Sequence, residues 1–279
     1  MLSNVVTPEH IKTYKENGAV FLEGVIAQPW LDLIEIGFER NLRCPGPFGM
    51  EADNKGTGRF FTDHYNFFVN PEYQRLLYDS PIVDILCDLM ETEETYLYYD
   101  QVFYKGGGSA DRTAFHQDMP YYQMEFSPQI TGAWISLDPL DAEHALEYIS
   151  GSHLGPLYNT FNLNNPKEPG VDQGAPPLPH ILKERDKWDI RSHATKPGDM
   201  LVIHPKVLHG GAPVSEGMQR RTMTVNVFGP DVRFLPKPQG LGMRYPGLAE
   251  ALKSGDPLRH PYFPQLRPVP ESQKVGRAA

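Results

Sequence analysis

The first third of the chain has the hydrophobic spacing of helices. From Gln28 to about Leu42 the apolar residues fall three or four positions apart, which predicts an amphipathic helix packed on a core. A shorter helix is expected to begin after Thr7-Pro8 and to end at Asn17-Gly18, because Thr is a favoured N-cap, Pro suits the first turn and Gly favours the end. Further expected elements are a buried strand at 19–22, a loop at 43–58 and one or two helices at 70–92.

Beyond residue 95 the pattern changes to short alternating or β-branched runs separated by Gly, Pro and Asn. The chain contains 27 Pro and 25 Gly residues, so the connections between these runs are expected to be long and irregular. Many short strands with such connections predict a sandwich or barrel. The expected strands are 95–99, 101–105, the run through His116, 130–137, 146–149, 200–203, 207–209 and 221–228. One short helix is expected at 248–253.

The 279 residues fit one large domain with extensions. We expect a single domain over 1–279 that is mainly β with flanking α-helices. Its parts are helical N-terminal support at 1–94, a barrel core at 95–230 with a lid-like insertion at 155–198, and a Pro-rich extension at 231–279.

The balance of charge excludes some classes of partner. The chain has 35 acidic and 26 basic residues and a net charge of −9, which argues against binding to nucleic acid or to an anionic membrane. No run of about 18 apolar residues is present and no signal peptide is visible at the start, so a cytoplasmic setting is expected. Two cysteines, Cys44 and Cys87, are too few for a disulfide framework or a Cys-rich zinc site.

The first candidate for chemistry is the stretch Thr113 to Asp118. Its aromatic and β-branched flanks predict a strand, and side chains two positions apart on a strand share a face. His116 and Asp118 would then lie side by side and supply two thirds of the 2-His-1-carboxylate triad that binds Fe(II) and leaves positions open. The alternative interpretation is a surface histidine near a carboxylate.

Such a triad needs a second histidine from another strand. His204 and His209 are the candidates. His209 is favoured because the two glycines after it allow a metal or ligand to approach the backbone, whereas the proline after His204 indicates a bend. A zinc finger built on these two histidines is excluded, because the chain has no paired Cys-x-x-Cys.

A pair of arginines follows eleven residues after His209. Arg220 and Arg221 begin a predicted strand, and strand alternation turns only one of them inward. A buried guanidinium needs an anionic partner, and a carboxylate of a dicarboxylate cosubstrate would match its planar fork. The alternative is two surface arginines at a strand end.

Six segments appear in the order of a known family. They are His116-Gln117-Asp118, 132–138, Gly151-Ser152-His153, Pro197-Gly198-Asp199, His209-Gly210-Gly211 and Arg220-Arg221-Thr222. On these segments the chain resembles the phytanoyl-CoA dioxygenase family of Fe(II)- and 2-oxoglutarate-dependent oxygenases. The resemblance implies a double-stranded β-helix, a jelly-roll or cupin-like barrel, with iron at one mouth.

The resemblance also implies roles for seven residues. His116, Asp118 and His209 would bind iron and form the catalytic centre, and Arg220 would bind the far carboxylate of 2-oxoglutarate, unless one inserted residue moves this role to Arg221. Three further residues match positions near the cosubstrate: Lys105, Gln117 and Trp134. Halogenating relatives replace the carboxylate with a small residue, so Asp118 favours oxygen chemistry. Departures from the family in 143–151 and at Pro213-Val214 affect loop shape and substrate contacts.

The activity implied is hydroxylation of an unactivated C–H bond of a small-molecule metabolite with Fe(II), 2-oxoglutarate and O2, releasing succinate and CO2. The alternatives are desaturation, ring formation or demethylation with the same cofactors, a zinc or manganese cupin-like hydrolase or isomerase, and a non-catalytic binding module. No large basic patch suits the phosphates of CoA. Removal of 162–176 should raise uncoupled 2-oxoglutarate turnover if 155–198 is a lid. Possible pocket residues are Arg59, His64, Tyr98, Tyr99, Tyr121 and Tyr122.

Overall fold

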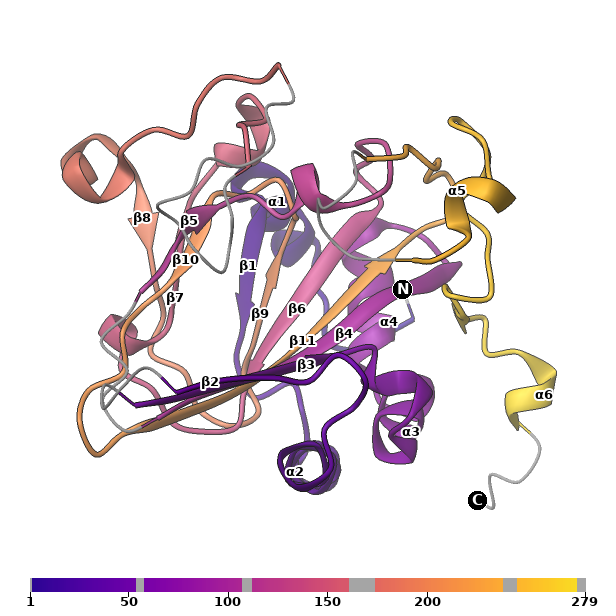
Figure 1. Cartoon of the computed structure of the whole chain (residues 1–279), viewed down its shortest axis with the longest axis horizontal. Coiled ribbons are helices and arrows are strands. Elements are labelled where there is room, and N and C mark those ends of the chain that lie inside the picture. The colour runs from indigo at the N-terminus through magenta and orange to yellow at the C-terminus, as the bar shows by residue number, and fades with distance from the viewer. Residues whose placement is uncertain (1, 54–57, 107–111, 161–173, 238–244, 275–279) are drawn as a thin grey trace.

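The computed structural model describes residues 2–53, 58–106, 112–160, 174–237 and 245–274. Two antiparallel sheets face each other, and helices cover the outer side of the larger sheet (Figure 1). The mainly β architecture with flanking helices predicted from the sequence is confirmed.

The larger sheet has eight strands in the order β1-β9-β6-β11-β4-β3-β2, and β12 pairs with β4. These strands are β1 (Ala19–Leu22), β2 (Met50–Asp53), β3 (Arg59–His64), β4 (Thr95–Gly106), β6 (Ile130–Ser136), β9 (Met200–Ile203), β11 (Gln219–Phe228) and β12 (Gln265–Arg267). The smaller sheet has the order β5-β10-β7-β8. Its strands are β5 (Thr113–His116), β7 (Leu146–Ile149), β8 (Ile190–Arg191) and β10 (His209–Gly211).

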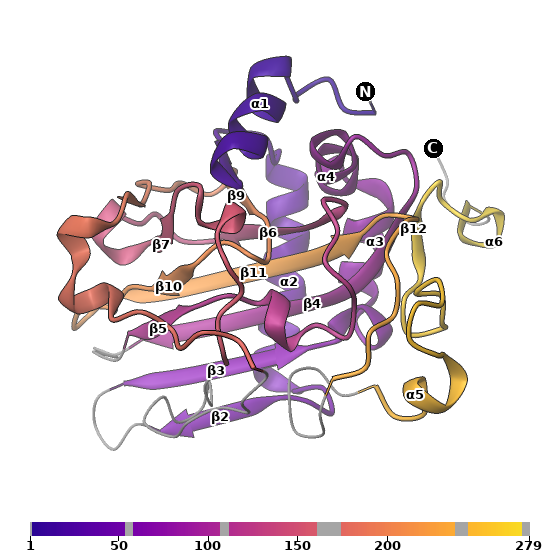
Figure 2. The ribbon, with the colours of Figure 1, turned by 90° about the horizontal axis from the view of Figure 1, so that it is seen from above.

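The helices form a layer on one side of the larger sheet and a few short connections elsewhere (Figure 2). The α-helices are α1 (Pro8–Asn17), α2 (Gln28–Arg43), α3 (Pro71–Asp79), α4 (Ile82–Met90), α5 (Leu248–Ala251) and α6 (Glu271–Lys274). The 3-10 helices are η1 (Asn66–Phe68), η2 (Met119–Tyr121), η3 (Ala142–His144), η4 (Ser152–Leu154), η5 (Ile181–Lys183) and η6 (Arg185–Lys187). As predicted, Thr7 caps α1, and Gly18 ends it in the left-handed conformation.

Strand alternation divides the larger sheet into two chemically different faces. On β11, Met223, Val225 and Val227 belong to the main core together with α2, α3 and α4. The intervening residues, from Arg220 through Asn226 to Phe228, therefore point to the opposite face, toward the smaller sheet. Because the helices bury only one face, the other face is available for polar side chains between the two sheets.

Four predictions about elements need correction. The expected loop 43–58 contains β2, because β3 beyond it offers an edge with which Met50–Asp53 pairs. The N-terminal part is thus more than helical support, since it gives three strands to the larger sheet. The strand through His116 ends at that residue, and Asp118 has helical backbone angles. The strand expected at 207–209 instead runs over His209–Gly211, because it pairs there with β5 and β7.

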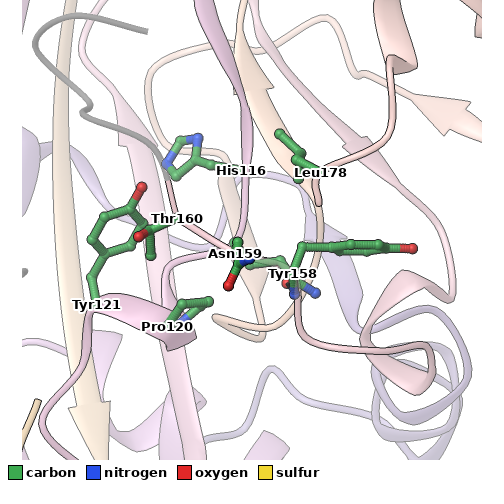
Figure 3. Close-up of a pocket in the computed structure, with 8 residues that line it drawn as sticks. His116, Pro120, Tyr121, Tyr158, Asn159, Thr160 and Leu178 are labelled. Carbon is green, nitrogen blue, oxygen red and sulfur yellow. Dashed lines mark hydrogen bonds between the residues drawn. The ribbon is translucent and has the colours of Figure 1, made fainter. Parts of the chain in front are cut away.

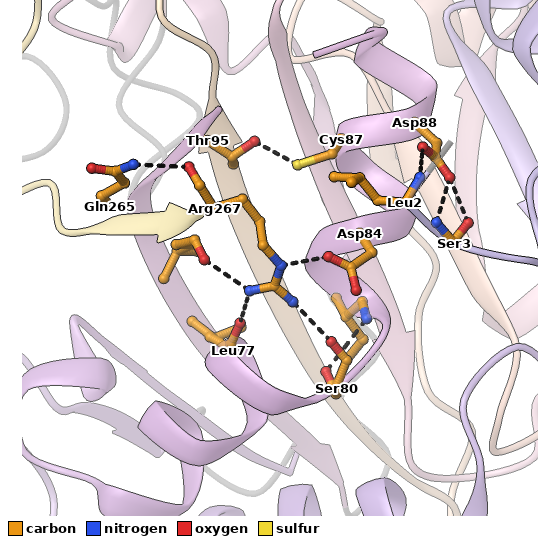
Figure 4. Close-up of polar contacts among 12 residues, drawn as sticks. Leu2, Ser3, Leu77, Ser80, Asp84, Cys87, Asp88, Thr95, Gln265 and Arg267 are labelled. Atoms are coloured by element: carbon orange, nitrogen blue, oxygen red, sulfur yellow. Dashed lines mark hydrogen bonds and ion pairs between the residues drawn. The ribbon is translucent and has the colours of Figure 1, made fainter. Parts of the chain in front are cut away.

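Both ends of the chain are tied to the helical layer by buried polar contacts (Figure 4). The guanidinium of Arg267 donates to the carbonyl oxygens of Leu77 and Ser80, at 3.2 Å each, and pairs with Asp84. These carbonyls belong to the end of α3, where no helical N–H is left to satisfy them. At the other terminus, the hydroxyl of Ser3 donates to Asp88 at 2.7 Å.

Candidate metal centre

The two sheets bring His116, Asp118 and His209 together, although His209 is far from the other two in the sequence. Their ligand atoms all lie within 4.8 Å of one another. Asp118 Oδ1 is 3.3 Å from His116 Nε2 and 3.8 Å from His209 Nε2. His116 and His209 are directly opposite each other on the paired strands β5 and β10, which explains why the rings meet.

Backbone carbonyls orient both imidazoles. His116 Nδ1 lies 2.8 Å from the oxygen of Ala114, and His209 Nδ1 lies 3.0 Å from that of Val207. A carbonyl only accepts hydrogen bonds, so each Nδ1 carries a proton. In the neutral rings the lone pair is therefore on Nε2, the nitrogen that faces Asp118, which is the tautomer that a metal ligand requires.

The three side chains also influence one another electrostatically. Burial acts to lower the pKa of His116, but the neighbouring Asp118 carboxylate raises it above its ordinary value. Burial likewise acts to raise the pKa of Asp118, yet His209 and His116 hold it below its usual range. Burial and the charge of His116 lower the pKa of His209. The carboxylate thus stays ionised although it lies in a buried site.

A turn formed by residues 204–206 positions Asp118. The oxygen of Pro205 accepts hydrogen bonds from the backbone N–H groups of Asp118 and Met119, at 2.8 and 2.9 Å. His204 fixes this turn, because its Nδ1 accepts from the N–H of Lys206 at 3.1 Å and its Nε2 lies 3.2 Å from the oxygen of Ser127. The rival candidate His204 therefore lies outside the triad and supports the loop that carries the carboxylate.

Arg220 is buried on the inner face with 7% of its surface exposed. Its Nη1 donates to the oxygen of His144 at 2.6 Å, and among the residues that the structure describes no acidic side chain lies within ion-pair distance. Burial lowers its pKa to about 10. A Cβ placed on Gly211 would lie 3.3 Å from its Nη2, so the guanidinium stands over β10, two residues from His209.

Arg221 has a different environment on the outer side of the sheet. Its Nη2 is 2.9 Å from Asp138 Oδ1 and its Nη1 is 2.8 Å from Glu35 Oε1. These carboxylates raise its pKa, with the hydrogen bond to Asp138 as the main cause. Since Arg221 already has two carboxylate partners, Arg220 is the arginine with a guanidinium to offer to a ligand.

Lys105 and Trp134 share the inner face with Arg220. Lys105 is buried directly opposite Arg220 on β4, and its Nζ donates to Thr113 Oγ1 at 3.2 Å. Trp134 packs with Tyr148 and other apolar residues in the space between the sheets. Two cationic side chains therefore lie side by side near the strand that carries His209.

Gln117 is held by backbone groups of the insertion and of the Pro205 turn. Its amide nitrogen donates to the oxygens of Pro156 and Lys206, at 3.1 and 2.9 Å, and its amide oxygen accepts from the N–H of Tyr158 at 2.9 Å. The side chain thereby fastens the start of the 155–198 insertion to the Pro205 turn. Its contact with the cosubstrate, which the family resemblance implies, stays a prediction.

A shallow hollow lies beside His116 (Figure 3). None of the described residues that line it is acidic, lysine or arginine. The lining consists of His116, Gln117, Pro120, Tyr121, Tyr158, Asn159, Thr160 and Leu178. Four of these come from the insertion 155–198, and no local pattern in the sequence indicated that they would meet His116. Residues 161–173 of the insertion, with most of the proposed 162–176 deletion, lie outside the described residues.

Of the residues expected to line a pocket, only Tyr121 borders this hollow. Tyr98, Tyr99 and Tyr122 are buried in a second core cluster that also holds the C-terminal segment. Arg59 is exposed and pairs with Glu51 at 2.7 Å, and His64 stacks on Phe48.

The family model for phytanoyl-CoA dioxygenase (PhyH) matches residues 14–222, which is most of the chain and includes all three triad residues. The chain belongs to the phytanoyl-CoA dioxygenase family. As a member of it, the chain is a non-haem iron, 2-oxoglutarate-dependent dioxygenase. The family resemblance of the sequence is thereby confirmed.

Curated relatives in this family are distant. The peroxisomal phytanoyl-CoA dioxygenase of Bos taurus is 24% identical over 247 residues, covering 78% of this chain and 67% of that protein. A probable phytanoyl-CoA dioxygenase of Caenorhabditis elegans is 22% identical over 237 residues, covering 78% of this chain and 74% of that protein.

Solved structures show the same fold. The non-haem α-ketoglutarate-dependent carbocyclase SnoK from nogalamycin biosynthesis superposes with a TM-score of 0.71 at 18% identity, covering 94% of this chain and 96% of that one. The epimerase SnoN in complex with Fe3+, α-ketoglutarate and nogalamycin RO gives 0.71 at 19% identity, covering 93% and 98%. EctD from S. alaskensis with 2-oxoglutarate and 5-hydroxyectoine gives 0.64 at 15%, covering 87% and 86%. The predicted double-stranded β-helix is thus confirmed.

Two simpler expectations concern membranes and cysteines. No helix in the described part of the chain combines the length and apolar character needed to cross a bilayer. Cys44 and Cys87 are both thiols, the first exposed and the second buried.

Proposed function

We propose that the chain hydroxylates an unactivated C–H bond of a small, uncharged metabolite, with Fe(II) held by His116, Asp118 and His209 and 2-oxoglutarate held by Arg220. The observation that carries this proposal is the convergence of the triad next to a buried arginine that has no acidic partner among the described residues. Lys105 and Trp134 are proposed as further cosubstrate contacts.

The donor set fits iron. Two neutral imidazoles and one carboxylate are the ligands of non-haem Fe(II) oxygenases, and both rings already present Nε2 to the carboxylate. When bound, iron and 2-oxoglutarate together supply the activation of O2 that oxidises a C–H bond, with release of succinate and CO2. The protein's own part is to hold the ligands, to orient the cosubstrate and to exclude water.

The position of Arg220 fits the length of 2-oxoglutarate. Its guanidinium stands over Gly211, two residues along β10 from His209. Two residues of an antiparallel strand span about 6.8 Å, a distance that a five-carbon dicarboxylate can bridge. The far carboxylate would then complete the hydrogen bonds of the buried guanidinium, and Lys105 on the neighbouring strand would add a second positive charge.

The hollow beside His116 supports a small neutral substrate. Its described lining offers tyrosine, proline and leucine surfaces with three hydroxyls, from Tyr121, Tyr158 and Thr160, and two amides, and no lysine or arginine that could pair with phosphates. An acyl-CoA, which the names of the curated relatives indicate for those proteins, would be expected to need such cations. We also propose that the insertion 155–198 covers the substrate, since it supplies half of this lining.

Other oxidative outcomes form the second candidate function. A carbocyclase and an epimerase share this fold at a TM-score of about 0.7. Ring formation, desaturation or demethylation would use the same triad and arginine, so the product decides between these reactions. A metal-dependent hydrolase would differ at Arg220, because it needs no 2-oxoglutarate.

The test is an anaerobic titration of the metal-free protein with Fe(II) and then 2-oxoglutarate, followed by absorption spectroscopy. We expect the weak visible charge-transfer band of the chelate. Asp118→Ala should abolish it, Arg220→Ala should weaken 2-oxoglutarate binding, and Arg221→Ala is the matched control that should keep it. If metal binds and no band forms, the oxygenase function is wrong. If Arg221→Ala weakens the band and Arg220→Ala does not, the assignment of the arginine is wrong.

A further inference from the structure

The two oxygens of Asp118 have different neighbours. Oδ1 faces the two histidine Nε2 atoms, at 3.3 and 3.8 Å. Oδ2 faces the hydroxyl of Tyr122, at 3.4 Å. One oxygen of the carboxylate thus faces the candidate metal site, and the other faces the protein. Tyr122 is a hydrogen-bond donor to the second oxygen.

Tyr122 is itself fixed by two neighbouring strands of the larger sheet. Its hydroxyl is 3.1 Å from the hydroxyl of Tyr99 on β4 and 3.1 Å from the side-chain oxygen of Asn226 on β11. Tyr99 and Asn226 are directly opposite each other in the sheet. Tyr122 is 2% exposed, so its ring cannot turn away without disturbing the core.

The hydrogen-bond capacities of this cluster favour donation to Asp118. A phenol donates one hydrogen bond and accepts two, and an ionised carboxylate only accepts. The hydroxyl of Tyr122 has two acceptors in the structure, Asn226 Oδ1 at 3.1 Å and Asp118 Oδ2 at 3.4 Å, and Tyr99 can donate to its oxygen. Of the two acceptors, the ionised carboxylate of Asp118 forms the stronger bond with the single proton of Tyr122.

We propose that Tyr122 is a positioning residue that holds Oδ2 of Asp118 away from the iron, so that Asp118 binds through Oδ1 alone. A carboxylate that used both oxygens would occupy one more coordination position, which 2-oxoglutarate or O2 needs. Tyr99 and Asn226 act through Tyr122. This inference rests on the iron site proposed above.

The decisive comparison is Tyr122→Phe with Tyr98→Phe. Tyr98 belongs to the same buried cluster, and its hydroxyl accepts from the N–H of Gln123 at 2.9 Å, away from the carboxylate of Asp118. Both changes remove one buried hydroxyl and keep the ring. A loss caused only by weaker packing should therefore affect both variants equally.

The measurements are the dissociation constant for Co(II), the position of the anaerobic Fe(II)–2-oxoglutarate band, and thermal unfolding of the metal-free proteins. We expect Tyr122→Phe to bind Co(II) about tenfold more weakly and to shift the band, as loss of a hydrogen bond to a metal ligand typically does. Tyr98→Phe should keep both values even if it melts earlier. Tyr99→Phe should show a smaller loss of affinity than Tyr122→Phe.

The inference is overturned if Tyr122→Phe keeps the affinity and the band of the unaltered protein, or if Tyr98→Phe loses as much. If Tyr122→Phe does not fold, Tyr99→Phe must still bind Co(II) more weakly than Tyr98→Phe, and equal affinities overturn the inference. If the unaltered protein binds metal but forms no band, the proposed function fails instead.

Discussion

Arg220 and Arg221 show how one step along a strand separates two roles. Alternation turns the first toward the space between the sheets and the second toward Asp138 and Glu35. The sequence could predict that only one of them faces inward. Which one does depends on the register of β11 against β4, where Arg220 lies opposite Lys105. A register is set by contacts far apart in the chain, so local pattern left the choice open.

Gly211 is expected to control the position of Arg220. A Cβ there would lie 2.9 Å from Thr113 Oγ1 and 3.3 Å from Arg220 Nη2, so Gly211→Ala should displace the guanidinium. A hydrogen bond to a charged group contributes about 1.5–3 kcal/mol, so loss of the contact with the guanidinium should raise the KM for 2-oxoglutarate about tenfold or more. Fe(II) affinity should change little. Steady-state kinetics and metal titration check this, and an unchanged KM would contradict the placement of 2-oxoglutarate at Arg220.

His204 should make stability depend on pH. Burial lowers its pKa from 6.5 to about 4 in the folded protein. Between these values the unfolded chain binds a proton that the folded chain does not, so the free energy of unfolding falls as pH decreases from 6.5 to 4. This difference in pKa between the unfolded and the folded chain corresponds to about 3 kcal/mol in the free energy of unfolding.

Urea unfolding of the unaltered protein and of His204→Gln at several pH values between 4.5 and 7 tests this. The variant should be less stable near pH 7, and its disadvantage should shrink toward pH 4.5. Taking the difference removes the effect of other groups, such as Asp100, whose pKa burial raises to about 6. Parallel curves for the two proteins would mean that His204 does not titrate as inferred.

At the scale of elements, the strands and helices with strong local patterns were predicted, and those defined by a partner were not. The helix 28–43 and the strand 130–136 have clear periodicity and were found. The short strands β2 and β12 have no such signal and exist because β3 and β4 offer edges. Asp118 was expected on a strand, yet it meets His116 through the turn at Pro205. The closeness of His116 and Asp118 was therefore predicted from a local geometry that proved different.

The contact of Arg267 with α3 and α4 should stabilise the whole helical layer. Arg267→Ala leaves the carbonyl oxygens of Leu77 and Ser80 without this donor and removes the partner of Asp84, which is partly exposed. We expect the free energy of unfolding to fall by about 2–3 kcal/mol. Chemical denaturation measures this. Lys187→Ala, which breaks an exposed pair with Glu184, is the control and should have no measurable effect.

At the scale of the whole molecule, the three tryptophans lie in three different parts. Trp30 packs against the main core, Trp134 lies between the sheets, and Trp188 packs with Ile181 in the insertion. The sequence predicts a single domain over 1–279. The fluorescence of one tryptophan therefore reports on each of three parts of it: the N-terminal part, the barrel core and the insertion.

Three variants that keep one tryptophan each should unfold in urea with the same midpoint after correction for the effect of each substitution on stability. Equal midpoints are expected because the main core includes residues from the helices, the barrel strands and the tail. A lower midpoint for Trp188 alone would mean that the insertion opens separately. A lower midpoint for Trp30 would contradict the single domain.

Both imidazoles of the triad carry their proton on Nδ1 through backbone carbonyls, so the site is a ready chelator before any metal arrives. Nitrogen and oxygen donors bind divalent ions with an affinity that rises from Fe2+ through Co2+ and Ni2+, and nothing in this donor set reverses that order. The choice of iron then depends on which ion is abundant where the chain folds. A sample purified on nickel resin is expected to hold nickel. Its measured turnover would then depend on which metal the protein bound during purification.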